Sequence, residues 1–203
     1  ERERLSHQAS TLADNLVPQL DAVNRAMQGL SAELPRLRGE ADGLAQLTVR
    51  LKAYSDAMTA VRYMSLLDAR GTIIASSEPS LVGLDSASRS YFKAAEQASS
   101  SDTLVVSPPF RGGLGGWVMV LARKVVTRDG GFAGVLAAAI DANNFRTLLQ
   151  SLRYAPDVFI SVSHGDGLRF LAVGHPGARE GVSLDYPGRP WLAHRRSGAA
   201  ASL

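Results

Sequence analysis

The chain has 203 residues, of which 45% are hydrophobic and 20% are charged, and its net charge is +3. This composition is typical of an ordinary globular protein with one sizeable core, and the absence of cysteine excludes disulfides and thiolate metal sites. No apolar run approaches the roughly 18 residues needed to span a bilayer. The basic residues are scattered, apart from Arg195-Arg196 beside His194, so nucleic-acid binding is not expected.

A long amphipathic helix is expected over residues 5–30. Its apolar residues are spaced three or four positions apart, which is typical of one helix face; they are Leu5, Ala9, Leu12, Leu16, Leu20, Val23, Met27 and Leu30. Pro18 is expected to kink this helix or split it into two, because proline removes a backbone hydrogen bond. Residues 31–40, with their proline and glycine, are expected to break the pattern.

A second helix with a heptad-like apolar stripe is expected to follow and to pack with the first against a sheet. The stripe consists of Leu44, Leu47, Leu51, Tyr54, Met58 and Val61.

Turn residues between apolar or β-branched segments then predict three antiparallel hairpins. Their paired segments are 62–67 with 72–76, 117–126 with 132–140, and 157–162 with 168–173. A further strand is expected at 103–107, where Pro108 ends it, and a helix carrying Phe145 is expected after Asp141. Because hairpins dominate, the sequence predicts an α+β fold with an antiparallel sheet and flanking helices.

The segment from Asp85 to Ala95 combines an arginine with two aromatic residues at the start of a short predicted helix. Asp85 or Ser86 is expected to cap this helix. Arg89 offers a planar fork of donors that matches a carboxylate, and Tyr91 and Phe92 offer pocket walls. The alternative is an amphipathic helix whose aromatic residues only fill the core.

Patterns for catalysis are weak throughout the chain. The glycine-rich segment 111–116 lacks phosphate-loop spacing and precedes a strand, so it is expected to be a hairpin or a pocket lid. The four histidines show no metal-binding spacing, and Ser161 and Ser163 near His164 lack a nucleophile elbow. No cofactor, metal site or enzymatic activity is therefore expected, and a hydrolase is only a third hypothesis.

Five segments, taken in order, resemble double-Cache sensor domains, which are PAS-like and extracytoplasmic. They are L-L-D-A-R-G-T-I-I-A-S-S, G-L-D-S-A-S-R-S-Y-F-K-A-A, V-S-P-P-F, W-V-M-V-L-A-R-K-V and D-G-G-F-A-G-V-L-A-A-A-I-D-A-N-N-F. The resemblance spans roughly Leu66 to Leu152. It implies a ligand-binding module that precedes a diguanylate cyclase, a histidine kinase or a chemoreceptor in a membrane-anchored protein.

Carried over by position, the resemblance implies a binding site formed by Arg89, Tyr91, Phe92, Trp117, Met119, Arg123 and Asp141. Arg89 would hold a carboxylate. Trp117, Met119 and Arg123 alternate along one strand, so they share one sheet face, and they would form the pocket floor. Trp117 could instead only anchor the sheet, and Asp141 could either pair with a ligand ammonium or cap a helix.

Two departures from the amino-acid-binding pattern concern the ligand. Leu84 stands where that pattern has tyrosine, and the pair Tyr91-Phe92 stands where tryptophan comes first. A simple organic acid is therefore expected rather than an amino acid.

The resulting hypothesis is the periplasmic portion of an inner-membrane protein that binds a small carboxylate and signals through its N-terminal helix. A homodimer through that helix is expected, and the chain is expected to be an excised fragment. The predicted parts are residues 1–61 with two helices, 62–155 as the membrane-distal ligand module, and 156–203 as a partial, reduced or truncated membrane-proximal module. The alternative function is a ligand-free dimerisation and spacer domain.

Overall fold

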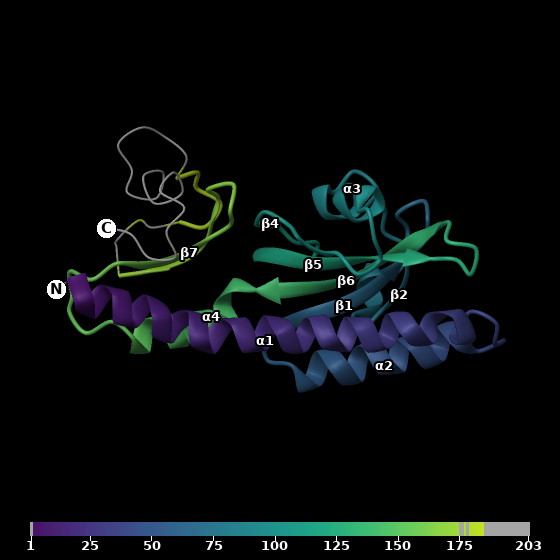
Figure 1. Cartoon of the computed structure of the whole chain (residues 1–203), viewed down its shortest axis with the longest axis horizontal. Coiled ribbons are helices and arrows are strands. Elements are labelled where there is room, and N and C mark those ends of the chain that lie inside the picture. The colour runs from purple at the N-terminus through teal and green to yellow at the C-terminus, as the bar shows by residue number, and fades with distance from the viewer. Residues whose placement is uncertain (1, 175–176, 178, 185–203) are drawn as a thin grey trace. The chain divides into compact units, whose positions relative to one another are not determined.

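The computed structural model describes residues 2–174, 177 and 179–184 (Figure 1). Four α-helices and one short 3₁₀ helix accompany the strands of this part of the chain. The helices are α1 (Arg2–Leu37), α2 (Gly43–Ala57), η1 (Pro79–Leu81), α3 (Ser90–Gln97) and α4 (Ala142–Ser151). The strands are β1 (Val61–Leu67), β2 (Ile73–Ser76), β3 (Leu104–Val106), β4 (Phe110–Arg111), β5 (Trp117–Val126), β6 (Phe132–Asp141), β7 (Ile160–Ser163) and β8 (Arg169–Val173).

The chain forms two compact units. The first, which we call the sheet unit, comprises residues 19–107 and 119–141. The second, the hairpin unit, takes its described residues from 1–18, 108–118 and 142–203. The division of the sequence into modules at residues 62 and 156 stays a prediction.

The main sheet has the strand order β2-β1-β6-β5-β3, and β4 pairs with the beginning of β5. The β1–β2, β1–β6, β3–β5 and β4–β5 pairings are antiparallel. In the central pair, Leu66 lies opposite Leu136, and both side chains are fully buried. The predicted α+β fold is confirmed, as is the hairpin formed by β1 and β2.

The long helix α1 continues through Pro18 and through residues 31–37 as one element. The helix is therefore not split at Pro18, and the break expected over residues 31–40 begins only after Leu37. Each proline removes one hydrogen bond of the helix ladder and crowds the carbonyl four residues earlier, at a cost of about 3 kcal/mol. Packing of the face that α1 buries within the sheet unit outweighs that loss. This face consists of Val23, Met27, Leu30, Leu34 and Leu37, none more than 1% exposed.

The predicted stripe of α2 is only partly buried. Leu47 and Leu51 are in the core, whereas Leu44 is 49% and Tyr54 36% exposed. Val61 belongs to β1 and not to the helix. The heptad pattern overestimated the buried face: α2 contacts β1 and β2, and only Gly43, Leu47 and Leu51 of this helix are buried.

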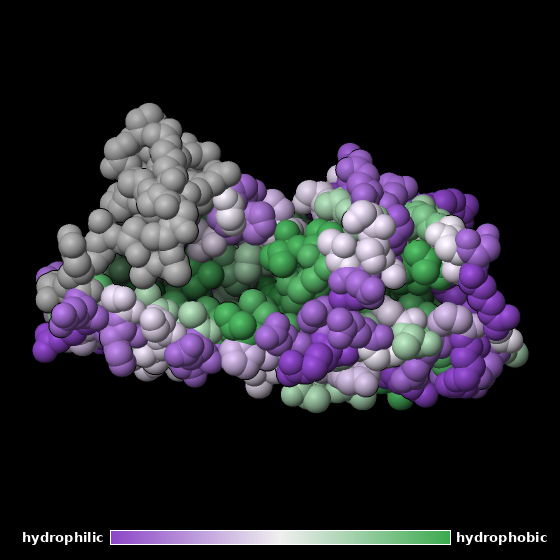
Figure 2. Space-filling view, in the orientation of Figure 1, coloured by the Kyte–Doolittle hydropathy of each residue, from purple (hydrophilic) through white to green (hydrophobic). Residues whose placement is uncertain are grey.

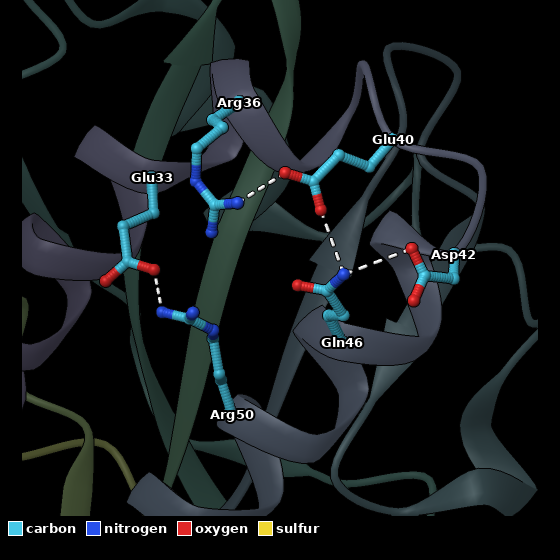
Figure 3. A network of polar contacts seen from close by, with 6 residues as sticks. All are labelled: Glu33, Arg36, Glu40, Asp42, Gln46 and Arg50. Carbon is cyan, nitrogen blue, oxygen red and sulfur yellow. Dashed lines mark hydrogen bonds and ion pairs between the residues drawn. The ribbon is translucent and has the colours of Figure 1, made fainter.

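Polar side chains link the end of α1 to the beginning of α2 (Figure 3). The ion pairs are Glu33–Arg50 and Arg36–Glu40, and Gln46 donates to Glu40 at 2.9 Å and to Asp42 at 3.0 Å. The side chains of the Glu33–Arg50 pair are 36% and 38% exposed, and the surface at this end is mostly hydrophilic in Figure 2. Exposed pairs of this kind stabilise little, so the buried leucines hold the two helices in place.

Within the hairpin unit, α4 packs against β8, and β8 pairs with β7 as the third predicted hairpin requires. Arg146 of α4 donates to the Ala172 carbonyl at 3.3 Å and pairs with Glu180 at 2.6 Å. His175 and the basic run from His194 to Arg196 lie outside the described residues. Among the described helices, none is long and apolar enough to cross a membrane.

Two substitutions in α2 separate the contribution of core burial from that of the exposed ion pairs. Leu47→Ala is expected to lower the free energy of unfolding by about 2–5 kcal/mol, because it opens a cavity in the core. Arg50→Ala, three residues away, is expected to cost at most about 1 kcal/mol, because its ion pair is exposed. Urea denaturation of both variants measures the difference. Equal losses would contradict the view that burial, and not the polar network, attaches α2.

Candidate functional site

The segment before α3 is anchored to the turn between β1 and β2. Ser86 donates its backbone N–H to the Gly71 carbonyl at 2.9 Å, and Thr72 forms a β-bridge with Asp85. Gly71 has a φ of +88°, and a Cβ there would lie 2.6 Å from the Ala87 Cα. Only glycine fits this turn, because both the backbone conformation and the close approach exclude a side chain.

The expected cap of α3 is wrong in its details. Asp85 accepts a hydrogen bond from the Ala87 backbone N–H at 2.8 Å and so closes a turn two residues before the helix. Arg89 occupies the N-cap position, and its side chain makes no cap hydrogen bond. The polar residues at 85 and 86 thus shape the approach to the helix and leave the Arg89 side chain at its exposed beginning.

Two phenols, of which Tyr91 is buried and Tyr63 is half-buried, lie beside two arginines in the sheet unit. Burial raises the pKa of Tyr91, while a hydrogen bond with the Ser86 side chain and the nearby charge of Arg89 act to lower it. Burial also raises the pKa of Tyr63, and Tyr91 adds to this rise against the opposing charges of Arg62 and Arg89. Because these effects act between residues of β1 and residues at the beginning of α3, we group them as one cluster.

Asp141, the last residue of β6, joins the same cluster. Its carboxylate lies 3.8 Å from Nε of Arg62, and the two side chains are 16% and 26% exposed. They meet because β1 and β6 are antiparallel, so the beginning of one strand lies beside the end of the other. We call Arg62, Tyr63, Arg89, Tyr91 and Asp141 the arginine–tyrosine cluster.

Phe92 is 3% exposed and meets Phe132 edge to face, with ring centroids 5.8 Å apart. This packing attaches α3 to β6.

Met119 and Arg123 lie on the opposite face of the sheet from α3. Arg123 reaches Asn24 of α1 at 2.9 Å, whereas its neighbour Lys124 donates to the Glu96 carbonyl at the end of α3. Neighbouring strand residues point to opposite faces, and Met119 shares the face of Arg123. Met119 and Arg123 were expected to form a pocket floor beneath Arg89. Their positions do not match this expectation, because the sheet lies between them and α3.

Trp117 belongs to the hairpin unit. Its ring lies over Arg111, with 5.5 Å from the guanidinium carbon to the ring centroid, and these residues are partners across the β4–β5 pair. A Cβ on Gly181 would lie 1.9 Å from this ring. The expectation that Trp117 is a ligand residue stays a prediction.

Sequence reasoning missed Arg62 and Tyr63. The two residues were recognised as the beginning of a strand, but the ion pair of Arg62 with Asp141 depends on the pairing of β1 with β6. Tyr63 joins the cluster through its interaction with Tyr91 and Arg89. The sequence did contain a signal for the proximity of Arg62 to Asp141. Two neighbouring antiparallel strands bring the beginning of one beside the end of the other.

The chemistry of the arginine–tyrosine cluster favours recognition of an anion. It contains two guanidinium groups and one carboxylate, and its phenols are neutral at neutral pH and able to donate hydrogen bonds, since a phenol titrates at about pH 10 and burial raises the pKa of both further. Within the described residues no group of three His, Asp or Glu side chains could hold a metal ion.

Solved structures with this arrangement are sensor domains. The extracellular domain of a protein named as a histidine kinase, rpHK1S-Z16, is 26% identical with a TM-score of 0.77, and the match covers 90% of this chain and 73% of that one. The chain has the fold of an extracellular sensor domain. The resemblance found in the sequence is thereby supported, and these neighbours are ligand-binding or sensor domains and not catalytic ones.

Two further neighbours come from named organisms. The sensor domain of the histidine kinase DctB from V. cholerae is 16% identical with a TM-score of 0.65, and the match covers 84% of this chain and 66% of that one. The ligand-binding domain of chemoreceptor Tlp3 from Campylobacter jejuni, in complex with 4-methylisoleucine, is 16% identical with a TM-score of 0.65, over 88% of this chain and 72% of that one. No family model and no curated protein matches the sequence.

Gly71→Ala is expected to destabilise the sheet unit by more than about 2 kcal/mol, because a strained φ of about 1–2 kcal/mol is combined with a backbone clash. Gly83→Ala is the matched control, since Gly83 has a φ of +90° and nothing within 4 Å of an added Cβ. Denaturation in urea should show the larger loss at Gly71. Equal losses would show that contact with the segment before α3 contributes nothing.

The raised pKa values of Tyr63 and Tyr91 predict that the protein loses stability at alkaline pH. Below pH 10 both states are protonated and the full stability is present. As the pH rises above about 10, the unfolded state loses these protons first, because the folded pKa values of Tyr63 and Tyr91 are raised, so stability should fall. Tyr63→Phe with Tyr91→Phe should make the fall shallower in urea titrations at different pH values. Tyr54→Phe on the surface of α2 is the control, and an equal effect there would contradict the prediction.

Proposed function

We propose that the chain is the extracytoplasmic, periplasmic sensor domain of an inner-membrane signalling protein, and that it binds a small organic acid at the arginine–tyrosine cluster. The observation that carries the proposal is the excess of positive charge there, with Arg62 and Arg89 against Asp141, beside two neutral phenols. A carboxylate would accept hydrogen bonds from a guanidinium and from a phenol, which are strong when the acceptor is charged.

The position of Asp141 favours an organic acid over an amino acid. An amino acid needs a carboxylate that is available to its ammonium group, and Asp141 already lies beside Arg62. Leu84 has an aliphatic side chain, so it does not supply the hydroxyl that a tyrosine would offer at that position. Some neighbours are titled as complexes with amino acids, and amino acids therefore belong in the test.

Signalling would require the ligand to favour one arrangement of the chain over another, because equal affinity for both shifts nothing. Binding at the beginning of α3 would pull this helix toward β1 and the end of β6. Through the sheet, the change would reach the buried face of α1, the helix that we propose carries the signal to a cytoplasmic histidine kinase or diguanylate cyclase. We also propose that α1 mediates a homodimer.

Calorimetry against a panel of small mono- and dicarboxylic acids and amino acids tests the site. Arg89→Ala should weaken binding of any acid that binds by about tenfold or more, as the loss of a charged hydrogen bond implies. Arg128→Ala, at the exposed turn between β5 and β6, is the matched control and should leave affinity unchanged. Equal affinity of wild type and Arg89→Ala would refute the assignment.

Asp141→Asn separates the two ligand classes. Removal of this carboxylate should leave or improve affinity for a simple acid and should abolish affinity for an amino acid. If no compound on the panel binds, the dimerisation and spacer alternative gains support, and sedimentation of the membrane-free chain then tests it. A monomer at high concentration would count against that alternative.

A further inference from the structure

A cavity lies in the sheet unit on the α1 face of the sheet, with a volume of about 300 Å³. It is lined by residues of α1, of the loop after α3 and of β5, among them Ser31, Pro35, Asp102 and Arg123. None of these residues belongs to the arginine–tyrosine cluster. The volume is at the lower end of the range for small-molecule sites, so the cavity suits a compound of few atoms.

Arg123 is the only fully buried charged group among the residues that line this cavity within the described chain, with 2% of its surface exposed. Its terminal nitrogens donate to the Asn24 side chain and to the Ser101 carbonyl, each at 2.9 Å. Asp102 lies 3.4 Å away, but its side chain is 91% exposed. The guanidinium thus has two neutral partners and one solvent-screened carboxylate. Together these groups compensate its buried charge poorly.

Two buried donors beside the cavity remain unused. Nε of Arg123 and Oγ of Ser31 have no hydrogen-bond partner among the described residues. Pro35, four residues after Ser31, also cannot donate to the Ser31 carbonyl in the helix ladder. Buried donors without partners are rare and costly in native proteins, and they indicate a missing water or ligand.

We propose that this cavity binds a small monocarboxylate, with Nε of Arg123 and the hydroxyl of Ser31 donating to its oxygens. A monoanion matches the single incompletely compensated charge, and the polar lining from Gln28, Ser101 and Thr127 accommodates a hydroxyl or keto group on the acid. This site goes beyond the function proposed above, because it uses other residues on the other face of the sheet. A bound acid would join α1 to β5 and to the loop after α3.

Nuclear magnetic resonance of the whole chain tests the site directly through the Nε–Hε signal of Arg123, assigned through its own side-chain carbons. Acetate, lactate and pyruvate are titrated separately, with sodium chloride at equal ionic strength as the reference. The expected result is a saturable shift of this signal with at least one of the three acids and no saturable shift with chloride.

Two variants define the outcome. Ser31→Ala should weaken the binding measured at Arg123 by about tenfold, the loss of one hydrogen bond to a charged acceptor. Ser55→Ala in α2, which does not line the cavity, should leave it unchanged. A signal that does not move, that moves equally with chloride, or that saturates with the same affinity in Ser31→Ala would overturn the proposal in favour of water alone.

Arg89→Ala distinguishes this site from the cluster at α3. It should leave the titration at Arg123 unchanged even where it abolishes binding at the arginine–tyrosine cluster. If Arg89→Ala abolished both binding at the cluster and the titration at Arg123, the two would be one shared site. The proposal of a separate site at Arg123 would then be overturned.

Discussion

The antiparallel pairing of β1 with β6 is the constraint on which the sheet unit depends. It brings together residues about 70 positions apart and buries both faces of the central strands, so Leu66 and Leu136 are fully buried at its centre. The same register sets Arg62 beside Asp141 and pairs Tyr63 with Ala139. The core and the candidate site are therefore consequences of one pairing, and a shift of one residue would turn every side chain to the other face.

The two faces of the sheet have different roles. On one face, Phe92 meets Phe132 and Lys124 holds the end of α3, which keeps the arginine–tyrosine cluster close to the strands. On the other, Arg123 connects β5 to α1 and to the loop that follows α3. Arg123 thus contacts both the proposed signalling helix and the segment next to the proposed ligand helix, and it offers a physical route between them.

Burial, and not surface charge, accounts for the position of the helices. The polar network between α1 and α2 is exposed, whereas the apolar face of α1 from Val23 to Leu37 is almost completely buried. Such packing explains why α1 tolerates two prolines within one element. Each costs one backbone hydrogen bond, and several buried side chains of about 1.5–3 kcal/mol each outweigh that cost.

The sequence alone determined the hairpins, the antiparallel α+β class and the long N-terminal helix, because turn chemistry and apolar spacing are local properties. It could not determine which distant residues meet. Arg62 reaches Asp141 only through strand pairing, and Arg123 is separated from α3 only because the sheet lies between them. Alternation along β5 was read correctly, but which helix covers which face is a tertiary property. Because α1 covers one face of the sheet and α3 the other, Arg123 faces α1, whereas Arg89 lies with the tyrosines on the opposite face.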